Sequence, residues 1–327
     1  MKLLLAKKKK LSIKQYVERR NDVLFVRKVG GLGDIFMHCM MFEDIKNTYP
    51  EIKIIFACPL KYMCVAQMHR YIDEVVDYST VNFSDYPVYF DTSKACVIYE
   101  MLKAPYADKH RSDIWANHFG FELTNHNLNL DLPQEYKDFG KIVVKDISGD
   151  RPSVALCPYS AMKMKNLKRW QVEIISNHIR KLGLSIFILH NEVSKDAISL
   201  NIPTIHDITI PQWMGVVSLV DYVITVDSAA FYYAGGIGKP LMGIFVHADG
   251  KVYNKYFNAT LVQKHRDNGD WDCGPCYDVL NCPKSSDILN LPCLIEINEQ
   301  MLIEGMDEMF KKTPINTTLH RSKHVYS

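Results

Sequence analysis

Two series of alternating strand-like and helix-like segments constrain the fold of this 327-residue chain more than any other feature. In the first half, apolar runs at 23–28 and 52–57 are each followed by residues with helical spacing of their apolar positions. Shorter strands are expected near 73–77 and 86–90, and a helix over 110–121. Alternation of this kind is typical of a parallel sheet with helices on both faces.

A second series begins after "KDISGDRP" (145–152), where Gly, Pro and charged residues suit a linker. The runs "SVALCPY" (153–159), "LSIFILH" (184–190) and "DYVITV" (221–226) are strand-like, and "RWQVEIISNHIRKLG" (169–183) has the apolar spacing of a helix. Order is expected to be weak in the stretch before the linker. The sequence therefore predicts an α/β protein with two doubly wound, Rossmann-like domains facing each other across a cleft.

The same pattern gives the expected domain limits. They are a basic N-terminal extension (1–22), a first domain (23–148), a second domain (149–311) and a tail (312–327). The formal net charge of +2 gives no bulk electrostatic reason to expect a nucleic-acid or membrane partner. No apolar run approaches the roughly 18 residues that span a bilayer, so we expect a soluble, cytoplasmic protein without a membrane span.

The loop "KVGGLGD" (28–34) directly follows the first strand. Gly30, Gly31 and Gly33 let the backbone approach a ligand closely, and the next helix offers free N–H groups. Asp34 begins that helix, where it could act as a cap or accept a proton from a hydroxyl nucleophile. The pattern G-x-G-x-x-G of dinucleotide-binding proteins is absent.

Two loops of the second domain are suited to an anion. "PYSAMKMKNLKRW" (158–170) follows a strand and carries Ser160 and several cations, Lys163, Lys165, Lys168 and Arg169, before a helix. It could bind a phosphate or be a solvated surface loop.

The second of these loops is the corner "VDSAAF" (226–231). Asp227 and Ser228 end one strand and begin a helix, so Ser228 could cap the helix while the N–H groups of Ala229 and Ala230 face an anion. Since both loops lie at strand ends of one domain, a diphosphate is the expected ligand.

Near the C-terminus, four cysteines have the spacing C-x2-C-x5-C-x10-C: Cys273, Cys276, Cys282 and Cys293. Four thiolates at such spacing could form a structural zinc site, or remain reduced in a long loop.

Taken together, these segments resemble glycosyltransferase family 9, the heptosyltransferase-like enzymes of the GT-B fold. The resemblance is carried by "GLGDIFMHCMMFEDIK", "ALCPYSAMKMKNLKRWQVEIISNHIRKLG" and "DYVITVDSAAFYYAGGIGKPLMGIFV", and by "CGPCYDVLNC" near the C-terminus. It covers most of the chain in order. It implies that the first domain binds an acceptor and that the second binds a nucleotide-sugar donor.

Carried over by position, Asp34 matches the proposed catalytic base of the family and Lys168 a lysine that contacts the donor diphosphate. Asp227 and Ser228 match the acidic and hydroxyl residues of its phosphate corner. Glu192 falls near its ribose-binding acidic residue.

Two positions depart from the family pattern. Ala229 stands where the family has glycine, and Tyr232 where it has histidine. Both lie beside the expected phosphates, so the donor sugar is open.

The resemblance implies an inverting glycosyltransferase that moves a hexose, pentose or heptose from a UDP- or ADP-sugar to an acceptor hydroxyl, without an obligatory catalytic metal. The expected acceptor is a bacterial surface glycan such as a lipopolysaccharide core. One alternative is a modified DNA base such as the 5-hydroxymethylcytosine of phage DNA, since the N-terminus is basic and tyrosines can stack on extruded bases. Another is a nucleotide-binding module without catalysis.

Overall fold

The structure is a computed structural model that describes residues 12–17, 20–86, 89–264, 274–277, 282, 284–287 and 289–314. Its first part contains β1 (Asp22–Val26), β2 (Lys53–Cys58), β3 (Glu74–Asp77) and β4 (Phe90–Asp91). The helices of this part are α1 (Ile13–Val17), α2 (Leu32–Thr48), α3 (Met63–Ala66), α4 (Ala95–Lys103), α5 (Arg111–His118) and α6 (Gln134–Ser148), with short 3-10 turns at Leu60–Tyr62, Tyr78–Thr80 and Phe83–Asp85.

The second part contains β5 (Ser153–Cys157), β6 (Ser185–Leu189), β7 (Thr204–Ile205), β8 (Tyr222–Val226), β9 (Leu241–Phe245) and β10 (Thr260–Gln263). Its helices are α7 (Arg169–Lys181), α8 (Lys195–Ser199), α9 (Ile210–Leu219), α10 (Ala229–Gly236), α11 (Gly250–Tyr253), α12 (Pro292–Ile295) and α13 (Glu299–Lys312), with a 3-10 turn at Lys163–Lys165.

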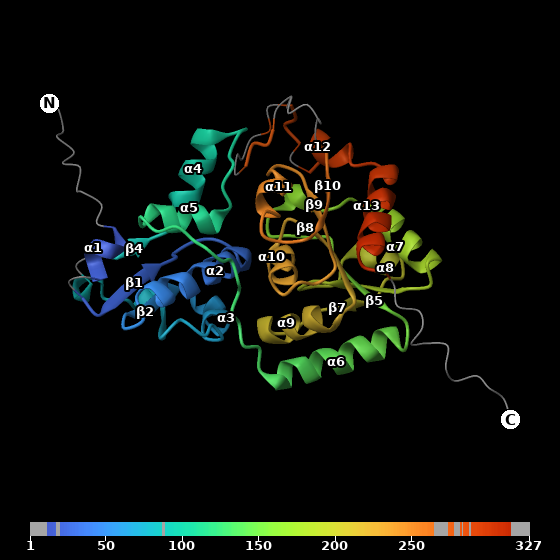
Figure 1. The fold of residues 1–327 in the computed structure, drawn as a ribbon. Coiled ribbons are helices and arrows are strands. Elements are labelled where there is room, and N and C mark those ends of the chain that lie inside the picture. Colours follow the sequence, from blue (N-terminus) through green and yellow to red (C-terminus); the bar gives the residue numbers. More distant parts are fainter. Residues whose placement is uncertain are drawn as a thin grey trace.

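These strands form two separate parallel sheets, which lie in two units side by side (Figure 1). The strand order is β3-β2-β1-β4 in the first sheet and β10-β9-β8-β5-β6-β7 in the second. Residues of β1, β5, β6, β8 and β9 are buried almost throughout, as is typical of parallel sheets. Helices cover both faces of the second sheet. In the first sheet, α2 and α5 cover one face, and the other packs against residues of β3 and of the turns that follow it: Val76, Tyr78, Val81, Phe83, Tyr86 and Tyr89. The predicted α/β class with two Rossmann-like units is confirmed.

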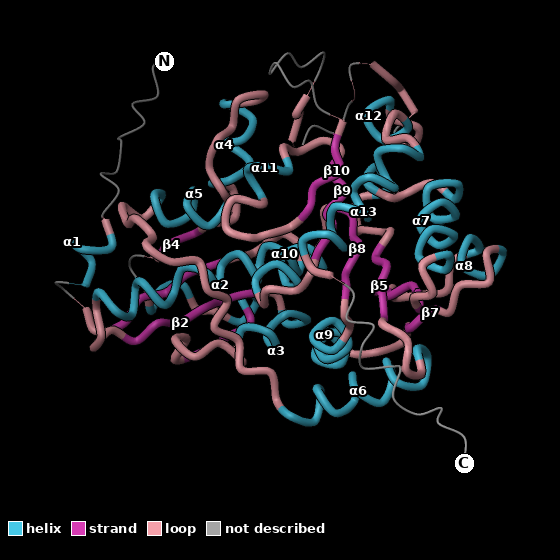
Figure 2. The backbone as a smooth tube through the Cα atoms, turned by 45° about the vertical axis from the view of Figure 1, so that its right-hand side comes forward, coloured by secondary structure: helices cyan, strands magenta, loops and turns pink. Residues whose placement is uncertain are grey.

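One expectation about local structure is wrong. The stretch before residue 149 is not weakly ordered, since α6 extends through Ser148 and packs against α9, its neighbour in both views (Figures 1 and 2). A Cβ atom added at Gly140 would lie 2.4 Å from the carbonyl oxygen of Gly215, so glycine at both positions lets the two backbones touch. The apolar face of α6 is therefore stabilised by α9, a contact far away in the sequence.

In the described part of the chain, no helix is both long and apolar enough to cross a membrane.

Candidate functional site

The glycine loop after β1 is shaped around the carboxylate of Asp34. Gly30 has a φ of +120°, and a Cβ atom there would lie 2.3 Å from Asp34 Oδ2 and 2.5 Å from Arg27 Nη2. Only glycine is compatible with both constraints. The backbone N–H of Gly31 donates to Asp34 Oδ2 at 2.9 Å. Asp34 thus acts as a cap of α2, which leaves a further role in chemistry open.

Two arginines hold the Asp34 side chain in place. Arg27 Nη2 lies 3.0 Å from Oδ2 and Arg111 Nη1 lies 3.1 Å from Oδ1, and Asp34 itself is 7% exposed. Burial raises the pKa of this carboxyl, but the two guanidinium groups more than offset it and hold the pKa below its usual value. Asp34 is therefore ionised at neutral pH.

Arg111 links Asp34 to the second unit. Its Nε and Nη2 donate to Glu100 Oε1 and Oε2, each at 2.8 Å, and Glu100 is only 1% exposed. The hydroxyl of Tyr253, on α11, donates to Glu100 Oε1 at 2.8 Å, and the guanidinium carbon of Arg111 lies 5.6 Å from the centre of the Tyr253 ring. The sequence did not point to these residues, because α4, α5 and α11 meet only in the folded chain.

The second unit presents a buried ion pair at the same junction. Asp227 is 6% exposed, and its Oδ2 lies 2.7 Å from Lys165 Nζ while its Oδ1 accepts a hydrogen bond of 2.8 Å from the Tyr232 hydroxyl. Burial raises the pKa of Asp227, yet the charge of Lys165 and these hydrogen bonds bring it down to about 2. His247, also buried, has no hydrogen-bond partner for Nδ1 within the described residues.

Both aspartates stand where parallel sheets bind ligands. Asp34 follows β1, whose neighbours are β2 and β4, while Lys165 follows β5 and Asp227 follows β8, which are adjacent strands. The strand order reverses at β1/β4 in one sheet and at β5/β8 in the other, and ligands of such sheets bind beyond the carboxyl ends at these points.

The two corners meet through close contact between α2 and α10, which lie between the sheets (Figure 1). A Cβ atom at Gly33 would lie 2.8 Å from Tyr232 Cδ2, so glycine is needed for this approach. The rings of Tyr232 and Tyr253 have centroids 6.0 Å apart. A continuous buried set of side chains thus joins Asp34 to Asp227 across the two units.

The other predicted residues of the 227–231 corner serve mainly to start α10. Ser228 is the N-cap, and its Oγ accepts from the N–H of Ala230 at 3.3 Å and lies 3.0 Å from Thr225 Oγ1. Ala229 is the first helical residue. The capping interpretation of Ser228 is confirmed, and the Ala230 N–H already has a partner.

Three further predicted residues have other partners or are exposed. Lys168 is the N-cap residue of α7, and its Nζ donates to the carbonyl of Leu289. Glu192 is exposed. Ser160 is half-buried and donates from Oγ to the Met162 carbonyl at 2.9 Å. It is Lys165 of the same basic loop, rather than Lys168, that reaches Asp227.

The predicted cysteine site lies partly outside the described residues, which do not include Cys273. Cys276, Cys282 and Cys293 are half-buried. Within the described ranges, no group of three or more His, Cys, Asp or Glu side chains is arranged to hold a metal ion. The four-cysteine zinc site stays a prediction. The basic N-terminal residues 1–11 are likewise outside the described chain.

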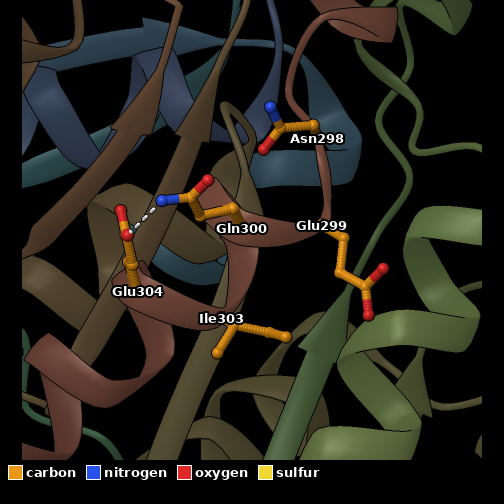
Figure 3. A pocket seen from close by; sticks show the side chains of 5 residues that line it. All are labelled: Asn298, Glu299, Gln300, Ile303 and Glu304. Atoms are coloured by element: carbon orange, nitrogen blue, oxygen red, sulfur yellow. Dashed lines mark hydrogen bonds between the residues drawn. The ribbon is translucent and has the colours of Figure 1, made fainter.

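Two surface hollows lie away from the junction. One of about 530 Å³ lies at the start of α13, where Gln300 donates to Glu304 at 2.8 Å beside Asn298, Glu299 and Ile303 (Figure 3). The other, of about 360 Å³, lies between the end of α6 and the amino end of β5. Neither contains a residue of the junction.

Comparison of this chain with known proteins finds similar structures but no similar sequence. No protein-family model and no curated protein sequence matches the chain. A family 9 glycosyl transferase from Veillonella parvula is similar with a TM-score of 0.68 and 12% identity, over 93% of this chain and 99% of that one.

Two Escherichia coli enzymes are similar as well. The iron-containing heptosyltransferase TibC, solved with ADP-D-beta-D-heptose, has a TM-score of 0.66 and 11% identity over 90% of this chain and 77% of that one. ADP-heptose LPS heptosyltransferase II has a TM-score of 0.58 and 10% identity over 89% and 99%.

The chain has the GT-B fold. It is the fold of the heptosyltransferase-like enzymes to which the sequence motifs were compared. On this GT-B fold, Asp34 belongs to the first Rossmann-like unit, and Asp227 and Lys165 belong to the second.

Proposed function

We propose that this chain is a nucleotide-sugar-dependent glycosyltransferase whose active site is the junction between its two units. The observation that carries the proposal is the placement of two buried carboxylates, Asp34 and Asp227, at the ligand-binding strand ends of two facing sheets. The similar solved enzymes include one with bound ADP-D-beta-D-heptose, which supports a sugar nucleotide as the donor class.

The donor would bind to the second unit. A diphosphate placed at the start of α10 would be near the N-terminal end of that helix and near Lys165 Nζ, which now contacts Asp227. The ammonium group of Lys165 is a compact charge on a flexible side chain, so it can contact both Asp227 and a phosphate oxygen. With this cation and the positive end of the helix dipole in place, an obligatory catalytic metal is not part of the proposal.

The acceptor would bind to the first unit beside Asp34. The acceptor hydroxyl oxygen forms a bond to the anomeric carbon, the bond from that carbon to the diphosphate oxygen breaks, and the hydroxyl proton passes to Asp34. The electron pair of the broken bond stays on the nucleoside diphosphate, where Lys165 stabilises the added charge. Attack from the face opposite the leaving group makes the reaction inverting.

For the acceptor we propose a bacterial surface glycan of the lipopolysaccharide-core type, since an LPS heptosyltransferase is among the enzymes of the same fold. We propose no specific sugar, because the Tyr232 hydroxyl, at a position where the resembled family has histidine, occupies Asp227 Oδ1 at the donor corner. UDP- and ADP-sugars are both candidates for the donor.

The first test is a calorimetric titration of ADP, UDP, GDP and CDP into the full chain, followed by turnover of the sugar conjugates of the preferred nucleotide. The proposal predicts binding of one nucleoside diphosphate and transfer from its sugar to a glycan. Binding without any transfer would favour the non-catalytic module. Transfer to hydroxymethylated DNA, with binding that falls steeply as salt increases, would favour the DNA base. No binding of any nucleotide would overturn the donor site.

A further inference from the structure

Helix α4 exposes an apolar face to solvent. Ile98, Met101 and Leu102 are 54%, 60% and 79% exposed, and Tyr106, just beyond the helix, is 75% exposed. Positions 98, 101 and 102 lie on one side of a helix. We call these four residues the α4 face. Apolar side chains that gather in this way, unlike scattered ones, mark an interaction surface.

The orientation of α4 is fixed by its other side. Cys96 and Glu100 are 2% and 1% exposed, and Glu100 is held by Arg111 and by the hydroxyl of Tyr253. The helix therefore cannot rotate to bury Leu102 without breaking the buried ion pair at the junction. Helix α4 lies at the upper edge of the first unit (Figure 1), and the α4 face is exposed.

The charges around this face are cationic at both ends. Lys94 immediately precedes α4 and Lys103 is its last residue, and both are exposed. The nearby carboxylate of Asp108 accepts a hydrogen bond of 2.5 Å from the Tyr99 hydroxyl. This hydrogen bond and the charges of Lys109 and Lys103 lower the pKa of Asp108. An apolar stripe flanked by lysines complements a surface that is apolar inside and anionic at its edge.

We propose that the α4 face docks on the surface of an anionic lipid bilayer. At nine residues, α4 is about 14 Å long and cannot span a hydrocarbon layer of about 30 Å, so it would lie in the plane of the interface. Ile98, Met101 and Leu102 would enter the headgroup boundary, and Lys94 and Lys103 would contact the lipid phosphates.

This orientation has a consequence for the junction. Glu100, on the inner side of the same short helix, lies in the network that holds Asp34. Docking through α4 would thus place the acceptor side of the junction about one helix diameter from the lipid surface, roughly 10 Å. Lipid binding itself requires neither nucleotide nor sugar, so the inference stands apart from the proposed reaction.

A second copy of the chain is the other occupant to consider. Two copies that met through this short helix would bring lysines of like charge together, whereas anionic lipid headgroups would complement them. Lipid is therefore the expected partner of the α4 face, and the test also detects self-association.

The test is co-sedimentation of the full chain with vesicles of phosphatidylcholine containing phosphatidylglycerol, and with vesicles of phosphatidylcholine alone. The double variant Ile98→Ser/Leu102→Ser should bind the anionic vesicles at least about tenfold more weakly. The variant Lys94→Gln/Lys103→Gln should also bind more weakly and show a smaller salt dependence. Ile142→Ser, which changes an equally exposed aliphatic residue on α6 (62% exposed), is the matched control and should bind as the parent does.

All variants keep the lysine-rich N-terminal sequence, so the difference between them reports on α4. Each is checked for an unchanged melting temperature and sedimentation coefficient. Three results would overturn the proposal: no vesicle binding by the parent chain, equal binding by the Ile98/Leu102 variant, or a parent oligomer that this variant converts to a monomer.

Discussion

The two units present buried aspartates to the same junction, but they hold them differently. In the first unit, Asp34 is fixed between Arg27 and Arg111, and Arg111 is itself bonded twice to Glu100. In the second unit, Asp227 has one lysine and one tyrosine hydroxyl. The first arrangement is a rigid clamp, because planar guanidinium groups bind carboxylates in fixed geometry, and the second can exchange partners by rotation of a lysine.

Because of this difference, the two units are suited to different roles in the proposed reaction. A carboxylate that must meet a hydroxyl in one position benefits from a clamp, whereas a phosphate site must accept and release a charged ligand. The first unit also buries more histidine. His38, on the same helix as Asp34, places its Nδ1 2.6 Å from the Asp34 carbonyl oxygen.

The largest expected effect is unequal sensitivity to acid. Burial lowers the pKa of His38 and His110 to about 3 and that of His69 to about 4, all in the first unit, against His247 alone at about 3 in the second. Below about pH 6.5 the histidines of the unfolded chain bind protons, whereas the buried histidines of the folded chain stay neutral. The contribution of these histidines to the free energy of unfolding is therefore fully present above pH 6.5 and is lost as the pH falls towards 4. By pH 5 the first unit, with three such histidines, should lose about 6 kcal/mol and the second, with one, about 2.

Hydrogen exchange followed by mass spectrometry, corrected for intrinsic rates, would measure this. Protection of α2 and α5 should disappear at a higher pH than that of α7 and α13. The replacement His110→Asn should lower the pH at which the first unit opens, and the same change at half-exposed His190 should not. Simultaneous loss of protection in both units would contradict this prediction.

The second largest effect is expected from removing the arginine that holds Asp34 and Glu100. Arg111→Ala would leave Glu100 buried without its cation, which is expected to lower the free energy of unfolding by about 3–5 kcal/mol. Chemical denaturation measures this change. Arg70→Ala is the matched control, because Arg70 and Asp131 form a similar bidentate pair that is more than half exposed. It should change stability little, and an equal loss in both variants would remove burial as the cause.

The lysine of the donor corner gives a smaller, more specific effect. Lys165→Ala should weaken binding of the preferred nucleoside diphosphate by about 10- to 100-fold, since it removes one charge-assisted contact. Lys168→Ala, three positions along, should weaken it by less than about threefold, because Lys168 is engaged with the Leu289 carbonyl. Calorimetry on both variants decides between them, and a larger loss at Lys168 would restore the expectation drawn from sequence.

The smallest effect tests the contact between the units. Gly33→Ala would force a methyl group against the Tyr232 ring and should destabilise the chain by about 1–2 kcal/mol. Gly31→Ala is the control, since nothing lies within 4 Å of the added carbon. Equal melting temperatures for the two variants would mean that α2 and α10 are not in close contact in solution.

The sequence was most informative where local pattern decides the structure. The runs "VLFV", "SVALC" and "SIFIL" are strands because parallel strands buried on both faces are almost continuously apolar. The glycine loop also placed Asp34 at the start of a helix, because a strand, three glycines and a helix start leave little choice for the backbone. The helix α6 was missed, since its polar residues outweighed the helical spacing of Tyr136, Phe139 and Val143, whose partner α9 is distant in sequence.

The side-chain contacts of the candidate site could be predicted only in part for the same reason. Lys165 and Lys168 are equivalent in a basic loop, and only the 3-10 turn at Lys163–Lys165 and the start of α7 decide which one reaches Asp227. No sequence motif marks Arg111, Glu100 or Tyr253. They become a network because α4, α5 and α11 pack together, which depends on how the two units meet.

The most direct test of the central claim compares Asp34→Asn with the parent chain in two assays, nucleotide binding and sugar transfer. Asparagine keeps the size of the side chain and can still accept the Gly31 hydrogen bond, but it cannot take up the acceptor proton. We expect a loss of transfer of about 100- to 10,000-fold with nucleotide affinity within about twofold of the parent. Unchanged transfer, or an equal loss of binding and transfer, would contradict it and leave Asp34 as a cap of α2.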